Sequence, residues 1–193
     1  MRCGWPTFNI QEPLHSGDSV EWLMDLHDGT DSLKPTLDTT ALGVVLSVPD
    51  YPYSHITRKE VVGIPVYGAD KVLESIHPCE MMQCTAPAES GGHSKMLGTA
   101  GDYVLVMTAT GPDVRSAQRQ VYKNLQSLTV PNSPMWRTDI GDRLKKELPL
   151  LQAKGYVKGM QYQQPSSTAS PTKPSTPSKP ASMNIGQMQI IYV

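Results

Sequence analysis

The stretch Asp102-Tyr-Val-Leu-Val-Met-Thr-Ala-Thr-Gly-Pro-Asp113 decides the fold, because it joins a buried strand to the start of a helix. The apolar run from Tyr103 to Met107 and its continuation to Thr110 have the β-rich composition that is typical of a strand. Gly111-Pro112-Asp113 supplies a turn in which proline and aspartate suit the first positions of a helix. We therefore expect a strand over 103–110 and a helix that begins at Asp113.

The residues after Asp113 have the periodicity of an amphipathic helix. Apolar side chains recur at steps of three and four residues, at Val114, Ala117, Val121, Leu125 and Leu128. Polar side chains fall between them, at Arg115, Gln118, Arg119, Lys123 and Asn124. This spacing predicts one face packed on a sheet and an opposite face in water.

Working outward, the sequence predicts several further elements. Asp18 is a suitable N-cap for a helix over 18–28, with Glu21 placed as in a capping box. Leu42–Ser47 is predicted to be a buried strand, and shorter strands are expected at Val61–Val66, Lys71–Ile76 and Met81–Cys84. A last helix is expected from about Ile140 to Leu148, with a stop or kink at Pro149. The predicted fold class is α+β, with a small antiparallel sheet covered on one face by helices.

Composition limits the classes of function. The chain has 193 residues, which suits one domain with appendages, and its 17 basic and 18 acidic residues give no sign of a nucleic-acid or membrane partner. The longest apolar runs are too short to span a bilayer, the start lacks the apolar core of a secretory signal, and the three cysteines lack a disulfide-framework spacing. We expect a cytoplasmic protein.

The C-terminal part differs from the rest in composition. Between Gln163 and Ser182 there are five prolines, six serines and three threonines. Such a segment buries too little apolar surface to offset the entropy of ordering, so a disordered Pro/Ser/Thr-rich tail is predicted. Its prolines could instead dock on a proline-recognising domain. The final Gln-Ile-Ile-Tyr-Val could add a strand to a partner's sheet edge, but an unstructured end is favoured.

Several motifs of the chain resemble one known family. Tyr103-Val-Leu-Val-Met-Thr-Ala-Thr-Gly111, the helix with Ala117 and Tyr122, and Trp136-Arg-Thr-Asp-Ile-Gly141 resemble the C-terminal domain of phosphoribosylamine-glycine ligase (glycinamide ribonucleotide synthetase), whose pattern is R-V-L-G-V-T-A-T-G, helix, Y-R-x-D-I-G. Ala41-Leu-Gly-Val-Val-Leu-Ser47 with Tyr51-Pro52 is similar to the family's A-V-x-V-V-L-A-S-G-G-Y-P. Val61-Val62-Gly63 stands where the family has V-I-x-G. The resemblance covers roughly residues 2–153.

The resemblance implies three parts. Residues 1–38 would be a remnant of the ATP-grasp edge with one helix, 39–157 the ligase C-terminal-like domain, and 158–193 the disordered tail. The complete family enzyme uses ATP and magnesium to join glycine to phosphoribosylamine in purine biosynthesis. In this chain the magnesium-binding residues of the family have no counterpart, so no catalytic residue, metal ligand or cofactor is assigned to it.

The resemblance also implies substrate-binding positions. Arg2, Gly4 and Pro6 match the family string R-F-G-D-P, where Trp5 and Thr7 replace acidic residues of the family. Tyr51 and Pro52 match its G-G-Y-P loop, which faces the active cleft in the family. A mobile N-terminal arginine explains Arg2 equally well, and a purely structural turn explains Tyr51 and Pro52.

Four cysteine and histidine residues are candidates for a metal site. His77, Cys79, Cys84 and His93 are of zinc-ligand type, but they lack the paired spacing of a zinc knuckle.

Two hypotheses about the function are favoured. The chain is the C-terminal portion of the ligase, inactive alone and partnered by an ATP-grasp subunit or a missing upstream region. Alternatively, it is a non-catalytic interaction module derived from that domain and tethered by its proline-rich tail.

Overall fold

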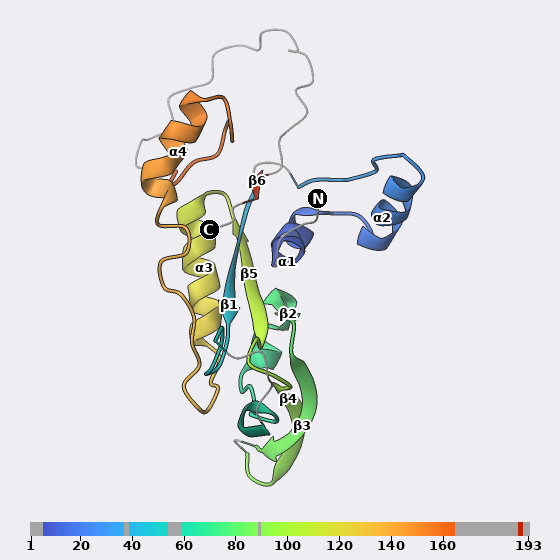
Figure 1. Cartoon of the computed structure of the whole chain (residues 1–193), viewed down its shortest axis with the longest axis vertical. Coiled ribbons are helices and arrows are strands. Elements are labelled where there is room, and N and C mark those ends of the chain that lie inside the picture. The colour runs from blue at the N-terminus through green and yellow to red at the C-terminus, as the bar shows by residue number, and fades with distance from the viewer. Residues whose placement is uncertain (1–5, 37–38, 54–58, 89, 165–188, 191–193) are drawn as a thin grey trace, which may run out of the picture.

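The computed structural model describes residues 6–36, 39–53, 59–88, 90–164 and 189–190. The helices are α1 (Thr7–Gln11), α2 (Ser19–His27), α3 (Val114–Gln126) and α4 (Leu144–Ala153). The strands are β1 (Thr40–Leu46), β2 (Ile76–Pro78), β3 (Met81–Pro87), β4 (His93–Thr99), β5 (Leu105–Gly111) and β6 (Gln189–Ile190). Figure 1 shows α3 beside the long strands β1 and β5, with the β3–β4 ribbon extending from one end of the molecule. The predicted α+β class is confirmed.

The main sheet is built around β5, which lies between β1 and β2. β1 and β5 are antiparallel along their whole length, from Thr40 opposite Gly111 to Leu46 opposite Leu105. β2 is also antiparallel to β5, with Ile76 opposite Met107. The predicted strands at 42–47 and 103–110 and their antiparallel sheet are therefore confirmed. Because opposed residues share a face, the apolar residues of β1 and β5 alternate between two sides of this sheet.

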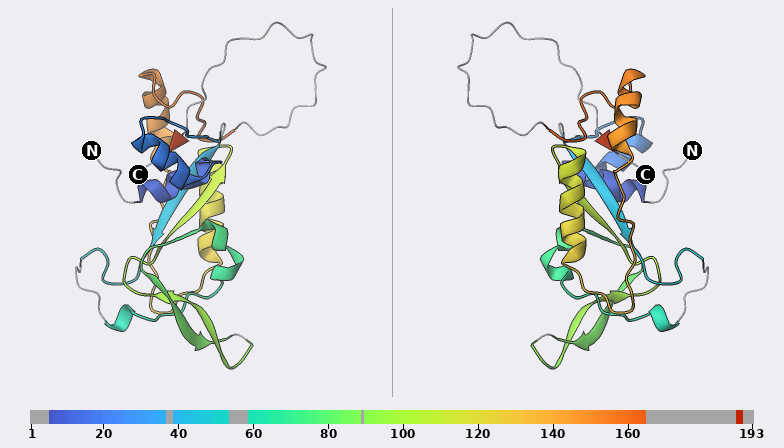
Figure 2. Two further views of the ribbon diagram at one scale, coloured as in Figure 1. Left: turned by 90° about the vertical axis from the view of Figure 1, so that its right-hand side faces the viewer. Right: turned by 90° about the vertical axis from the view of Figure 1, so that its left-hand side faces the viewer.

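Helix α3 covers one of these sides (Figure 2). Leu42, Val44 and Leu46 of β1 share a core with Leu105 and Met107 of β5 and with the inner face of α3. All five residues of the predicted apolar face are buried, namely Val114, Ala117, Val121, Leu125 and Leu128. The periodicity therefore identified this helix and its orientation correctly.

Two side chains that were predicted to face water are buried instead. Gln118 is only 5% exposed, and its amide nitrogen donates to the Ile140 carbonyl (2.9 Å) and to Asp142 Oδ1 (2.7 Å). Asn124 is 8% exposed and donates to Ser75 Oγ at 3.1 Å. Both amides are buried because residues distant in the sequence supply their hydrogen-bond partners, which the helical pattern cannot reveal.

The opposite side of the sheet receives the N-terminal segment. Ile10 of α1 and Leu14 form a second small core with Ala41. Gly43 makes this approach possible, because a Cβ at this position would lie only 2.5 Å from the Ile10 side chain. Helix α1 was not predicted from the sequence.

The region between β1 and β5 differs from the prediction in several places. Val61–Val66 and Lys71–Ile76 were predicted to be strands, but these predictions are wrong for most of their lengths: 3-10 turns occupy 59–61, 69–71 and 73–75, and β2 begins at Ile76. Positive φ angles at Gly63 and Gly68 interrupt an extended chain here. The strand predicted at 81–84 is confirmed as β3, which pairs with the unpredicted β4 in a separate two-stranded ribbon.

Helix α4 continues through Pro149 rather than ending before it. Leu144 and Leu148, before the proline, are buried against Val114 and Met160, and after the proline Gln152 Nε2 donates to the Met160 carbonyl at 2.7 Å. Met160 lies beyond the predicted domain boundary at 157, and the chain remains hydrogen-bonded as far as Gln164, whose backbone N–H donates to Asp113. The packed region therefore extends further than the composition indicated.

The rest of the predicted tail is described only at β6. Residues 165–188 and 191–193 lie outside the described residues, and so does most of the predicted disordered segment. β6 runs parallel to β1, with Gln189 opposite Thr40 and Ile190 opposite Ala41. The C-terminal segment thus adds a short strand to the edge of the chain's own sheet.

Asp113 caps α3 and joins it to the C-terminal segment. It is 4% exposed and accepts hydrogen bonds from the backbone N–H groups of Ser116 (2.6 Å) and Gln164 (2.7 Å). Burial acts to raise the pKa of Asp113, but these N–H groups and the charge of Arg119 outweigh burial and lower the pKa from its usual value.

We predict that Asp113→Ala loses about 1–2 kcal/mol of unfolding free energy at pH 7, because two backbone donors lose their acceptor. Since the folded pKa lies below the unfolded one, the carboxylate's contribution is complete above the unfolded pKa and is lost as pH falls through the folded pKa. Urea unfolding at pH 7 and pH 3 should show a difference between parent and variant that shrinks at pH 3. Asp113→Asn, which keeps an acceptor, should lose less, and equal stability of Asp113→Ala and the parent at pH 7 would contradict the prediction.

Candidate functional site

The structure describes part of the substrate site that the resemblance implies. Arg2 and Gly4 lie outside the described residues. Pro6 precedes α1 and accepts a hydrogen bond from the backbone N–H of Ile10 at 3.3 Å. Thr7, at the position of a family glutamate, is the first residue of α1. Pro6 is therefore held on a helix that packs against the sheet through Ile10.

Tyr51 and Pro52 lie in the turn that follows β1. The Tyr51 ring meets the ring of Tyr103 edge-on, with centroids 5.3 Å apart. The turn is tied to the segment before β5 by a hydrogen bond from the Val48 N–H to the Asp102 carbonyl at 2.9 Å. Pro52 is exposed. Tyr51 thus has a packing role, because an aromatic pair of this kind stabilises the turn against the sheet.

The described parts of the implied site come from different regions of the sheet. Helix α1 contacts β1 through Ile10 near Ala41 and Gly43, whereas Tyr51 and Pro52 follow Leu46 at the other end of the strand. Figure 2 shows α1 and this turn at different levels along the long axis of the molecule. Pro6 and Tyr51 are therefore positioned by separate elements.

His77 stands on the same side of the sheet as α1, because it lies opposite Val106 in the β2–β5 ladder. Its Nε2 atom shares a hydrogen bond of 2.9 Å with the hydroxyl of Thr108, which is 2% exposed. Burial lowers the pKa of His77, and the negative charge of Glu12 acts in the opposite direction. A neutral imidazole hydrogen-bonded to a buried threonine is a stable structural arrangement, and its partner lies 31 residues away in the sequence, where no local pattern reveals it.

The cysteines near His77 are separated by the turn between β2 and β3. The Cys79 thiol donates to the His77 carbonyl at 3.6 Å, and burial raises the pKa of Cys79 to about 11. Cys84 packs under Gly98 of the neighbouring strand β4, where an added Cβ would lie 2.5 Å from its sulfur. Within the described ranges, no group of three or more His, Cys, Asp or Glu side chains is placed to hold a metal ion.

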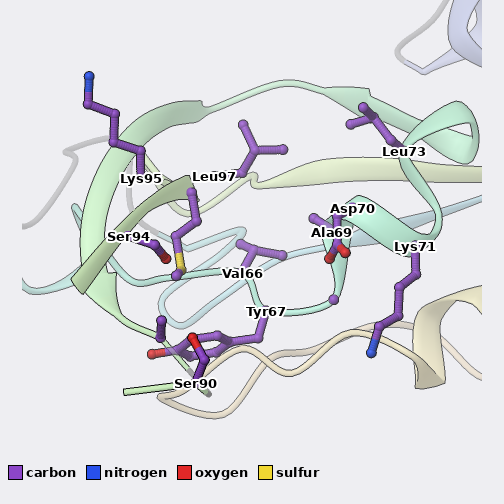
Figure 3. A pocket seen from close by; sticks show the side chains of 13 residues that line it. Val66, Tyr67, Ala69, Asp70, Lys71, Leu73, Ser90, Ser94, Lys95 and Leu97 are labelled. Atoms are coloured by element: carbon purple, nitrogen blue, oxygen red, sulfur yellow. The ribbon is translucent and has the colours of Figure 1, made fainter. Parts of the chain in front are cut away.

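A cavity of about 550 Å³ lies between β4 and the 3-10 turns that follow Val66. Figure 3 shows the Tyr67 ring along one wall and the side chains of Val66 and Leu97 toward the interior. In the same view Lys71 and Lys95 stand at opposite ends, with their ammonium groups directed away from each other. The two lysines therefore do not converge on one bound group, and the interior is suited to an apolar one.

Helix α2 carries the most extensive apolar surface of the N-terminal segment. Asp18 caps it as predicted, and its Oδ1 accepts from the N–H groups of Val20 (2.8 Å) and Glu21 (3.0 Å). No residue of α2 is buried. Its apolar side chains are exposed by 70% at Val20, 48% at Leu23, 59% at Met24 and 42% at Leu26.

Local contacts hold α2 in place without covering this surface. Trp22 donates from Nε1 to Asp31 Oδ1 at 3.0 Å, and its ring lies 5.6 Å from that of His15. In Figure 1, α2 stands to one side of the sheet, away from α3. An amphipathic helix normally buries its apolar side, so this surface, named here the α2 face (Val20, Leu23, Met24 and Leu26), is a candidate interface.

Comparison of the sequence with models of known protein families finds no match, and comparison with curated proteins finds none either. In the part of the chain that the structure describes, no helix combines the length and apolar character needed to cross a membrane.

Proposed function

We propose that this chain is the C-terminal portion of a phosphoribosylamine-glycine ligase, or of a divergent relative, and that it works in the cytoplasm. In this proposal it docks on ATP-grasp domains carried by a separate subunit or by a preceding region. Those domains bind ATP and magnesium and carry out the ligation of glycine to phosphoribosylamine. The chain alone is inactive, because the family's nucleotide and magnesium residues have no counterpart here.

The observation that carries the proposal is that the motifs resembling the family are neighbours in space. Ala41–Ser47 supplies β1, and Tyr103–Gly111 supplies β5, which pairs with it. The helix with Ala117 and Tyr122 packs on both strands. Motifs that are separated in sequence but build one core are more specific together than each is alone.

The last motif contacts the same helix. Trp136 packs against the main core, and the Tyr122 hydroxyl donates to the Arg137 carbonyl at 2.9 Å while accepting from the Ile140 N–H at 3.1 Å. The paired side chains of Arg137 and Asp139 extend into solvent, 2.7 Å apart. The W-R-T-D-I-G motif therefore fixes the segment after α3 to that helix. A packing role of this kind accounts for the similarity between this motif and the family's motif.

The α2 face supports the docking part of the proposal. It belongs to the segment that resembles the ATP-grasp edge, and it exposes four apolar side chains that a partner surface would cover. A stable interface buries about 1,000 Å² or more in total, so this helix can form the centre of one but not the whole.

A non-catalytic interaction module is the second candidate, and one observation favours it. Thr7 begins α1 at the position where the family has a glutamate, so the described part of the implied site lacks that negative charge. Such a module also needs an apolar docking surface, and the α2 face serves both candidates. The two functions therefore differ in turnover rather than in binding.

The test is to mix the full chain with a matching ATP-grasp portion of a ligase. Complex formation is followed by size-exclusion chromatography, and turnover by phosphate release with ATP, glycine and phosphoribosylamine. We expect a complex whose phosphate release exceeds that of either part alone. A complex without turnover favours the interaction module, and the absence of any complex contradicts the proposed docking.

A pair of variants tests the docking surface itself. Leu23→Asp with Met24→Asp places two charges on the α2 face and is expected to weaken the complex by a factor of about 100 or more. Leu150→Asp, at a 65% exposed leucine of α4, makes the same kind of change away from this helix and should leave binding within about twofold. Equal weakening by both changes would show that the α2 face is not the docking surface.

A further inference from the structure

A second concave site lies beside helix α3, on the side that faces away from the sheet. This hollow, of about 340 Å³, is formed between α3 and the segment that follows Arg137. Arg115, Arg119 and Lys123 line the helical wall, and Thr138 and Asp142 line the other. Figure 2 shows α3 and this segment running side by side. We refer to it as the α3 hollow.

The helical wall has an unusual charge for this chain. The protein as a whole has 17 basic and 18 acidic residues, yet α3 contains Arg115, Arg119 and Lys123 and no aspartate or glutamate. Steps of four residues place the three cations on one side of the helix, about 6 Å apart along its axis. The α3 hollow therefore has a row of positive charges along one wall.

This wall cannot rotate, because the other side of α3 is the core of the domain. Ala117, Val121 and Leu125 lie on the side of α3 that faces the sheet, and they are fully buried. Gln118, 5% exposed, accepts from Arg115 Nη1 at 3.1 Å and donates to Asp142 Oδ1 at 2.7 Å, so it links the two walls. The backbone that carries the three cations is therefore fixed before any ligand binds, so only their side chains lose freedom on binding.

The positive charges are only partly offset. Among the residues that the structure describes, the ion pairs within 4.0 Å are Arg137–Asp139 and Arg143–Glu147, which include none of the three cations. Asp142 is the carboxylate in the hollow, and it already accepts from Gln118. The charge of Asp113 acts on Arg119, but this buried carboxylate is directed at the backbone N–H groups of Ser116 and Gln164. An excess of positive charge remains along the wall.

We propose that the α3 hollow binds a small polyvalent anion of the diphosphate class. Arg119 and Lys123 supply the charge, and Gln126 and Thr138 supply neutral hydrogen-bond donors at the rim. A guanidinium group can donate two parallel hydrogen bonds to one phosphate, and an ammonium group can neutralise a second phosphate one helical turn away. The diphosphate can belong to free pyrophosphate or to a nucleoside diphosphate.

The experiment is a titration of the full chain by isothermal calorimetry at low ionic strength, with inorganic phosphate, pyrophosphate and ADP in parallel. The parent should bind pyrophosphate more tightly than inorganic phosphate, because two phosphates engage two cations. ADP binding as tightly as pyrophosphate supports recognition of the diphosphate alone, and tighter ADP binding supports a nucleoside diphosphate as the source. No binding of pyrophosphate by the parent overturns the proposal.

Two double variants with the same change in charge make the test specific. Arg119→Gln with Lys123→Gln should weaken pyrophosphate binding by a factor of about ten or more, since a hydrogen bond to a charged group is lost at each position. Lys145→Gln with Lys146→Gln, at exposed positions of α4, should change binding by about twofold or less. Equal weakening by both variants would indicate attraction to net charge alone and would overturn the proposal.

Loss of folding and loss of docking can both be distinguished from loss of pyrophosphate binding. All four substituted residues are exposed, so thermal unfolding of both variants should match the parent. The α3 hollow and the α2 face are on different elements, and a negative titration leaves the docking experiment unaffected. A variant that fails to bind pyrophosphate but still forms the ATP-grasp complex would show that the two surfaces act independently.

Discussion

Val121→Asp is expected to unfold the domain. Val121 lies in the middle of α3 with 0% exposure, in the core shared with β1 and β5. A carboxylate at this position loses its hydration and has no cation beside it in the main core cluster. The loss is about 4 kcal/mol or more, which is a large part of the stability of a small domain.

The measurement is thermal and urea unfolding followed by circular dichroism. Gln120→Asp introduces the same charge one residue earlier, on the exposed side of the helix, and should cost about 1 kcal/mol or less. If Val121→Asp melts at the temperature of the parent, the inner face of α3 has been assigned incorrectly.

Gly68→Ala is expected to produce the second largest loss, about 2–4 kcal/mol. Gly68 has a φ of 80°, and a Cβ there would lie 2.4 Å from the backbone carbonyl oxygen of Ser127. The neighbouring Tyr67 exchanges two backbone hydrogen bonds with Thr129, of 2.9 and 3.0 Å, so the two segments cannot separate without losing them. The new methyl group therefore forces a rearrangement of backbone against backbone.

A second glycine separates the two causes of this loss. Gly91 also has a positive φ, of 88°, but an added Cβ would meet nothing within 4 Å. Gly91→Ala should therefore cost only the conformational strain, about 1–2 kcal/mol. Urea unfolding of both variants measures the difference, and equal losses would mean that the close approach to Ser127 is absent.

The parts of the fold that could be predicted are those whose sequence pattern is local. Leu42–Leu46 and Tyr103–Met107 lack polar side chains apart from the tyrosine hydroxyl, and α3 has a clear helical period. Each of these elements could therefore be predicted from its own residues alone. Asp18 was predicted as a cap and Asp113 as the start of a helix for the same reason, since a helix start depends on a few consecutive residues.

The parts that could not be predicted depend on distant contacts. His93–Thr99 contains few strongly β-forming residues and becomes β4 only by pairing with β3. Val61–Val66 has β-branched residues, but the positive φ of Gly63 and the bridge between Pro65 and Gly98 give it a different path. Pro149 was expected to stop or kink a helix, and the helix in fact continues to Ala153, where Gln152 donates to the Met160 carbonyl of a later segment.

The candidate sites show the same division. The sequence assigned Tyr51 and Pro52 through resemblance, and the structure adds the packing of Tyr51 on Tyr103. Helix α2 was predicted from its cap, but the exposure of its apolar side chains could not be, because a local pattern does not show whether a covering element exists. The α3 hollow needs Thr138 and Asp142 to approach the helix from a later segment, which no local pattern encodes.

The exposed leucines and methionine of α2 also bear on the cellular fate of the protein. If the docking proposal holds, a copy made in excess of its partner is an orphan subunit that presents to chaperones the kind of surface they recognise. Degradation of unpaired copies would then adjust the amount of this chain to the amount of its partner, without any dedicated regulatory sequence. The exposed apolar surface of α2 would thus set the ratio of this chain to its partner.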